Sequence, residues 1–289
     1  MPSKFLFFPS KPKSLEIAAS FFVLHGYFAR DYAFLRVHSA VYILDCLYDF
    51  LTIDVESSQK FEINLSGDNP NIPYNEKNIV HKAIVSFVEK TNLTPHKFNV
   101  YIQKNIPTEA GLAGGSSDAV GTFLGINYLF NNPLSEKKLH ELCANLGSDL
   151  NVILMGGCVL AKGRGESVER LPFVEYPVSL IKPNNLGISA KEGYQKYAQL
   201  ENKPKNDNTH KMIELLKKGE DVRPLLYNDL ETAVYSDYEQ LQKIKSANPE
   251  SIMSGSGSTY FILSDKINPV DDYWFKEGLK TIATGCEIV

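Results

Sequence analysis

The sequence lacks a marked excess of charge of either sign, which limits the partners it can have. Its 289 residues include 30 lysines and arginines and 34 aspartates and glutamates, for a formal net charge of −4 at pH 7. Proteins that bind nucleic acids in general, or anionic membranes, need a strongly basic face. We therefore expect neither nucleic acid nor membrane as a partner, although a small basic pocket for phosphate groups remains compatible with this balance.

Long apolar runs and paired cysteines are also missing. The chain has no run of about 18 apolar residues, the length that a membrane-spanning helix needs, and the apolar run within residues 1–9 is too short for a signal peptide. No two cysteines have Cys-x-x-Cys spacing, which argues against a disulfide scaffold or a zinc module. The sequence thus predicts a cytoplasmic protein whose cysteines are buried free thiols: Cys46, Cys143, Cys158 and Cys286.

The order of the expected elements favours an α+β fold. At this length one hydrophobic core usually divides in two, so we expect either two domains, residues 1–157 and 158–289, or one unit with two lobes, as a monomer or homodimer. Because strands and helices follow one another without a regular βαβ rhythm, a doubly wound sheet is disfavoured. Strands are expected at 21–24, 41–44, 51–55, 61–65, 98–102 and 260–263. Helices are expected at 78–89, at 133–143 and within 201–222, and a further helix should follow the glycine-rich segment at 110–120 and end near residue 129.

A glycine-rich segment, residues 110–120, is the most informative part of the chain. It reads Ala-Gly-Leu-Ala-Gly-Gly-Ser-Ser-Asp-Ala-Val and runs directly into an expected helix. Glycine lets a backbone approach a ligand closely, and the free amides and dipole of a helix N-terminus favour an anion. The segment matches neither the Walker nor the Rossmann glycine pattern. It predicts a phosphate cradle, in which a side chain at Gly114 would block the phosphate; the alternative is a flexible turn before a helix.

A second run of small residues lies near the C-terminus. Residues 253–259 read Met-Ser-Gly-Ser-Gly-Ser-Thr and precede the expected strand at 260–263. Alternating glycine and serine can form an anion-binding nest or line a site where another backbone passes closely. The run is short and bounded by apolar residues, so it is not a disordered linker.

Together these segments resemble the motifs of the GHMP kinase superfamily. Residues 104–120 resemble its ATP-binding motif, Gly147-Ser-Asp-Leu-Asn resembles the element that carries the catalytic aspartate, and residues 253–261 resemble its third motif. Asn228-Asp-Leu-Glu231 also resembles a segment of the family's sequences. Within the superfamily, the sequence is most similar to the 4-diphosphocytidyl-2-C-methyl-D-erythritol kinases. The resemblance implies a two-lobed fold, with an N-domain like domain 2 of ribosomal protein S5 and a ferredoxin-like C-domain.

The resemblance also implies an activity and a set of site residues. It implies ATP with Mg²⁺ and a small-molecule substrate that carries a cytidine diphosphate, phosphorylated on its 2-hydroxyl in the non-mevalonate isoprenoid pathway. Asp149 matches the catalytic base, and the resemblance places Ser189, Gly255 and Ser256 among the substrate-binding residues. The residues that match the ATP-binding motif are Pro107, Ala110, Gly111, Leu112, Ala113, Gly114, Gly115, Ser116 and Ser117.

The N-terminal segment departs from the family pattern. Lys11 matches the family's catalytic lysine, but Lys13 stands where the family has asparagine. Tyr27 or Tyr32 would contact the cytidine, and His25 would replace the missing histidine. An alternative register puts the first strand at 20–24 and leaves no lysine at the catalytic position. Two further readings therefore stay open: a GHMP kinase for another small alcohol, and an ATP-binding homologue without catalysis.

Overall fold

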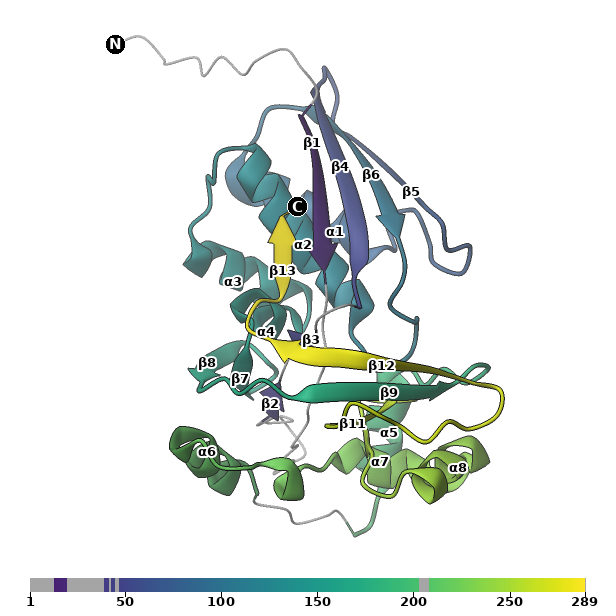
Figure 1. Ribbon diagram of the computed structural model, residues 1–289. Helices are drawn as coiled ribbons and strands as arrows, with labels where there is room; N and C mark the ends of the chain where they lie inside the picture. The colour runs from purple at the N-terminus through teal and green to yellow at the C-terminus, as the bar shows by residue number, and fades with distance from the viewer. Residues whose placement is uncertain (1–12, 20–38, 42, 45–46, 203–207, 289) are drawn as a thin grey trace.

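The computed structural model describes residues 13–19, 39–41, 43–44, 47–202 and 208–288. These form two lobes, one above the other in Figure 1, each built from a five-stranded sheet covered by helices. The mixed α+β architecture predicted from the sequence is confirmed. None of the helices in these ranges is both long and apolar enough to cross a membrane.

The upper lobe is a mostly antiparallel sheet. Its strand order is β13-β1-β4-β6-β5, and only the pair β5 and β6 runs parallel. On β4 and β6, alternate side chains such as Leu51, Ile53 and Val100 are buried, because successive residues of a strand face opposite sides. The strands are β1 (Lys13–Ala19), β4 (Asp49–Ser57), β5 (Glu62–Gly67), β6 (His96–Gln103) and β13 (Cys286–Ile288).

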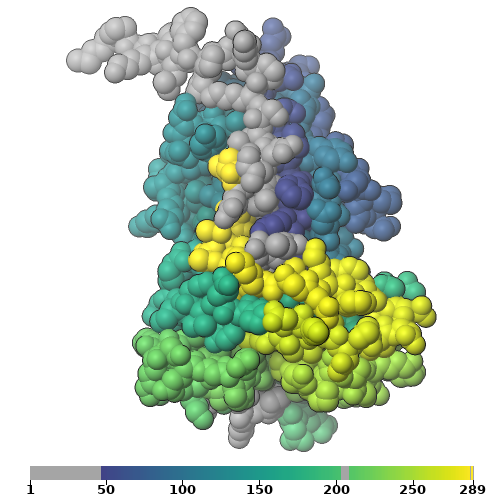
Figure 2. Space-filling view, in the orientation of Figure 1, coloured from purple at the N-terminus to yellow at the C-terminus, as the bar shows by residue number. Residues whose placement is uncertain are grey.

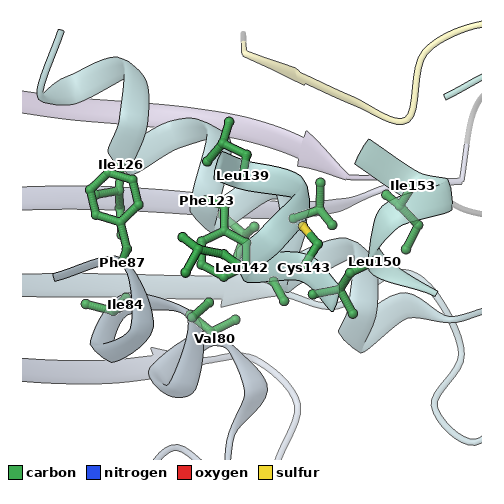
Figure 3. Close-up of a cluster of buried hydrophobic side chains, with 14 of the residues drawn as sticks. Val80, Ile84, Phe87, Phe123, Ile126, Leu139, Leu142, Cys143, Leu150 and Ile153 are labelled. Carbon is green, nitrogen blue, oxygen red and sulfur yellow. The ribbon is translucent and has the colours of Figure 1, made fainter. Parts of the chain in front are cut away.

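Four helices pack on one face of this sheet and close the main hydrophobic core. They are α1 (Ile79–Thr91), α2 (Gly114–Leu129), α3 (Glu136–Leu146) and α4 (Leu150–Met155). As expected, Asn78 caps α1, and its side chain accepts a hydrogen bond from the Val80 amide at 2.9 Å. Figure 3 shows Phe87 of α1 and Phe123 of α2 within this core, where both are fully buried. The core fixes α2, and with it the glycine-rich loop that precedes the helix.

The lower lobe holds an antiparallel sheet of order β10-β11-β9-β12-β3 and a three-stranded sheet of order β2-β7-β8. The strands are β2 (Ser39–Val41), β3 (Ile43–Leu44), β7 (Cys158–Lys162), β8 (Ser167–Leu171), β9 (Pro177–Pro183), β10 (Ile252–Met253), β11 (Tyr260–Ile262) and β12 (Tyr273–Ile282). The helices are α5 (Ala190–Gln199), α6 (Asn208–Lys218), α7 (Asp229–Val234) and α8 (Glu239–Ala247), with short 3₁₀ turns η1 (Arg223–Leu225) and η2 (Tyr235–Asp237).

The two lobes exchange strands. The C-terminal β13 pairs with β1 in the upper sheet, while β2 and β3, from the N-terminal part of the chain, pair with β7 and β12 of the lower lobe. Figure 2 shows the yellow C-terminal segment continuing from the lower lobe onto the upper one. The strand expected at 41–44 is therefore divided between two sheets, and a domain boundary at 157/158 stays a proposal. The strand expected at 21–24 lies outside the described residues.

The cysteines that the structure describes are free thiols, as predicted; Cys143 and Cys158 are buried, whereas Cys286 is only half-buried.

Candidate active site

A cavity of about 620 Å³ brings together segments that are far apart in the sequence. The glycine-rich loop lines it, as do Asp149 at the start of α4 and the loop before α1. The lower lobe contributes Ser189, Gly255 and Ser256. The cavity therefore lies where the two lobes meet, and it contains both the expected phosphate cradle and the expected base.

The glycine-rich loop presents backbone amides at the N-terminus of α2. Gly111 and Ala113 adopt the left-handed conformation, with φ of 71° and 49°. The first amide to bond back into the helix is that of Ser117, which donates to the Ala113 carbonyl at 3.0 Å. The three amides before it, at Gly114, Gly115 and Ser116, have no partner within the helix. Because the helix dipole adds positive potential here, this end of α2 suits an anion.

The two adjacent glycines of α2 have different roles. A Cβ on Gly114 would lie 3.0 Å from Ile106 and 3.2 Å from an Asp49 oxygen, so it points into the protein. A Cβ on Gly115 would meet only Ile79, at 3.8 Å, and Ile79 itself lines the cavity. The prediction that a side chain at Gly114 would fill the cradle is therefore wrong in its direction, and Gly115 is the position from which a side chain would enter the cavity.

Of the other residues matched to the ATP motif, Ser117 faces the protein interior and the rest line the cavity. Ser117 is fully buried, and its hydroxyl donates to the Ala113 carbonyl at 3.2 Å, so its side chain serves the helix start and does not line the cavity. The remaining members of the set all line it: Pro107, Ala110, Gly111, Leu112, Ala113, Gly114, Gly115 and Ser116.

A buried cation with two carboxylates supports this loop, and the sequence reasoning missed it. The Lys104 ammonium donates to Asp49 and, at 2.9 Å, to Asp118 Oδ2. All three side chains are at most 5% exposed. The other Asp49 oxygen accepts from the amides of Asn105 and Ile106 at 2.7 and 2.9 Å. The cluster thus ties β4 and the end of β6 to the N-terminal part of α2.

The charges of this cluster are perturbed by burial. Burial opposes the Lys104 charge, but the carboxylates of Asp118 and Asp49 outweigh it and raise the pKa of the lysine. Burial raises the pKa of Asp118 to about 8, against the opposing effect of Lys104. Asp118 Oδ1 has no hydrogen-bond partner among the described residues. For Asp118, burial favours the neutral acid and Lys104 favours the carboxylate, and burial is the larger of the two effects.

Asp149 stands at the start of α4 without capping it. Its side chain makes no cap hydrogen bond to that helix, which leaves the carboxylate for the cavity. Burial raises its pKa. Two neighbours fix the local backbone: Asn151 Oδ1 lies 2.9 Å from His140 Nδ1 of α3, and Gly165 packs so closely that a Cβ there would lie 2.0 Å from the Ser148 carbonyl.

The lower-lobe wall contains the three expected substrate-side residues. The Ser189 hydroxyl caps α5 by accepting from the Glu192 amide at 3.2 Å, and the Ser256 hydroxyl donates to the Ile188 carbonyl at 3.3 Å. Tyr194 also lines this wall. Its place in the wall was not predicted from the sequence.

Four predicted site residues lie outside the described residues: Lys11, His25, Tyr27 and Tyr32.

A preformed metal centre is not present in the described ranges, where no three histidine, cysteine or acidic side chains cluster. Mg²⁺ in nucleotide sites usually needs only one or two protein carboxylates, with phosphate and water oxygens completing its shell. The carboxylates that line the cavity are those of Glu109, Asp118 and Asp149. The donor set therefore fits an ion that arrives with a phosphate ligand.

Comparisons with known proteins show which family the chain resembles. The model of the GHMP kinases N terminal domain matches residues 78–157. The 4-diphosphocytidyl-2-C-methyl-D-erythritol kinase of Caldanaerobacter subterraneus subsp. tengcongensis is 34% identical over 250 residues, which cover 81% of this chain and 86% of that protein. The kinase of the same name from Clostridium tetani is 32% identical, over 74% of this chain and 78% of that protein.

Solved structures show the same fold at lower identity. A 4-(cytidine 5'-diphospho)-2C-methyl-D-erythritol kinase aligns with a TM-score of 0.64 at 24% identity, covering 88% of this chain and 90% of that one. Homoserine kinase from Cytophaga hutchinsonii aligns with a TM-score of 0.75 at 18% identity, covering 99% and 100%. The two-lobed α+β fold, the family model and the relatives at 34% and 32% identity all point to one family: the chain belongs to the GHMP kinase family.

Proposed function

We propose that this GHMP kinase transfers the γ-phosphoryl group of ATP to the 2-hydroxyl of 4-diphosphocytidyl-2-C-methyl-D-erythritol. One observation carries the proposal: the 34% identical relative that bears this activity in its name aligns over 86% of its own length. The cavity supports it, because the glycine-rich loop and Asp149 share one space between the lobes.

In this proposal the chain supplies positioning and charge, which are the main requirements of phosphoryl transfer. The amides of Gly114, Gly115 and Ser116 bind the phosphates at the positive end of α2. Asp149 accepts the proton of the substrate hydroxyl as the bond to phosphorus forms. Its burial, which raises its pKa, brings the carboxylate closer to the range of an effective general base. Mg²⁺, when bound, neutralises phosphate charge.

The substrate side of the cavity fits an acceptor with both polar and aromatic parts. Ser189, Gly255 and Ser256 offer backbone and hydroxyl groups, and Tyr194 offers an aromatic ring near which a nucleobase can stack. Ser148 and Asp149 line the same space from the upper lobe. The cytosine contacts expected from His25 and from Tyr27 or Tyr32 remain proposals.

A panel of acceptors tests the substrate assignment. The purified protein is incubated with ATP, Mg²⁺ and one acceptor at a time, namely the cytidine-bearing alcohol, mevalonate or homoserine, and ADP is measured while mass spectrometry identifies the product. We expect turnover with the cytidine-bearing acceptor and a product with one added phosphate. Turnover with mevalonate or homoserine alone would overturn the substrate. ATP binding by calorimetry without any turnover would instead indicate a non-catalytic homologue.

A further inference from the structure

The loop of residues 253–259 makes close contact with the backbone of the glycine-rich loop. The Ser254 hydroxyl donates to the Gly111 carbonyl at 2.9 Å, and the Thr259 amide donates to the Ala110 carbonyl at 3.2 Å. A Cβ on Gly111 would lie 2.1 Å from the Ser254 carbonyl, and one on Gly255 would lie 2.8 Å from the Gly111 carbonyl. The place of the phosphate cradle therefore depends on where the lower-lobe loop lies.

A single buried side chain holds that lower-lobe loop. Asn228, 4% exposed, donates both hydrogens of its amide group, one to the Met253 carbonyl and one to the Gly255 carbonyl, each at 2.7 Å. Its oxygen accepts from the Leu230 amide at 2.9 Å and so caps α7. Glu231 adds a third contact by accepting from the Met253 amide at 3.0 Å. The start of α7 thus fixes both ends of the Met253–Gly255 turn.

We propose that Asn228 is a positioning residue of the kinase site: through residues 253–257 it sets the glycine-rich loop at Gly111 and so places the ATP phosphates relative to Asp149. The proposal rests on the proposed use of the glycine-rich loop for ATP. The contacts form one continuous series from α7 to the loop, and Leu230 and Gly255, both within that series, line the cavity. Asn228 itself does not line the cavity; it acts through the backbone that it holds.

The variant Asn228→Asp separates this role from simple helix capping. Aspartate caps a helix as well as asparagine does, so a residue that only caps would tolerate the change. A positioning asparagine would not, because the two donors are lost and a carboxylate is placed against two carbonyl oxygens. Asn228→Ser, which keeps a cap acceptor without adding charge, is the milder second variant should the first fail to fold.

Asn248→Asp is the matched control. Asn248 is 1% exposed, its amide group donates to the Asn268 carbonyl at 2.9 Å, and its oxygen accepts from the Asn268 amide at 2.8 Å. Like Asn228→Asp, the Asn248→Asp variant therefore removes a buried amide donor, but neither Asn248 nor Asn268 lines the cavity. Any effect that is general to a weakened fold should appear in both variants.

Three measurements decide the matter, all well below the unfolding temperature. We expect Asn228→Asp to weaken ATP binding in calorimetry, to lower kcat by about 100-fold, the cost of a misplacement near 1 Å, and to speed hydrogen exchange at the amides of Ser254 and Thr259. Asn248→Asp should match the wild type in all three. Wild-type ATP affinity and exchange in Asn228→Asp and Asn228→Ser would overturn the proposal. Binding and exchange need no acceptor, so they remain decisive even if the substrate assignment fails.

Discussion

Asp118→Asn tests the buried Lys104 cluster through the pH dependence of stability. In the folded chain burial raises the pKa of the Asp118 carboxyl from 3.8 to about 8. Between these values the folded chain holds a proton that the unfolded chain has released. The free energy of unfolding therefore falls as pH rises through this window, and it is constant below and above it as far as this group is concerned.

The magnitude follows from the width of that window. One pH unit is worth at most about 1.4 kcal/mol for a single proton, so the loss between about pH 5 and about pH 8 is at most about 4 kcal/mol. The asparagine in Asp118→Asn resembles the protonated acid and leaves the Lys104–Asp49 pair intact. The variant should lack the slope, so its stability relative to the wild type should rise with pH.

Urea unfolding at several pH values measures this difference. The wild type, Asp118→Asn and the exposed control Asp271→Asn are compared at each pH, since other groups titrate equally in all three. We expect the curve of Asp118→Asn to diverge from the other two between about pH 5 and about pH 8. If the stabilities of Asp118→Asn and the wild type ran parallel across this range, Asp118 would be ionised throughout and the description of the cluster would be refuted.

Three further predictions concern the cavity. Asp149→Asn should lower turnover by about 10²- to 10⁴-fold, the usual contribution of a general base, while calorimetry finds ATP affinity largely retained; loss of ATP binding would mean that Asp149 is structural. Gly115→Val should abolish ATP binding with little change in the unfolding temperature. Gly114→Val should mainly lower the unfolding temperature, because only the Cβ at position 114 meets Ile106; the reverse result would contradict the side-chain directions given above for these two positions. Lys104→Met should cost about 3–5 kcal/mol in urea unfolding because it leaves the buried Asp49 carboxylate without its cation, and adding Asp49→Asn should restore part of that loss; equal stabilities of the single and double variants would argue against a shared charge cluster.

The sequence predicted those features that depend on neighbours along the chain. Asn78 before an apolar stripe indicated the start of α1, and the structure places the cap there. Alternation of apolar and polar residues indicated β4 and β5, and the glycine-rich run before a helix indicated the cradle. These signals are local: a cap, a period of two or a stretch of small residues has the same physical meaning wherever the segment lies.

The sequence did not indicate which side chains meet across the fold. Asp49, Lys104 and Asp118 look like ordinary surface charges in the chain, yet they converge because β4, β6 and α2 pack together. Asn228 looked like part of a family motif, and its partners lie 25 and 27 residues away. Pairings at such separations are chosen by packing, since no short-range preference distinguishes one distant partner from another.

By itself, then, the sequence determined the α+β class and predicted the glycine-rich cradle and, through the family resemblance, the base at Asp149, because each is encoded in a short run of residues. Only the tertiary structure decided that a side chain at Gly115 rather than at Gly114 would enter the cavity, that Ser117 turns inward, and that β13 returns to the upper sheet. A side chain's direction depends on which face of its helix or strand is covered, and that face is settled only when the lobes have packed.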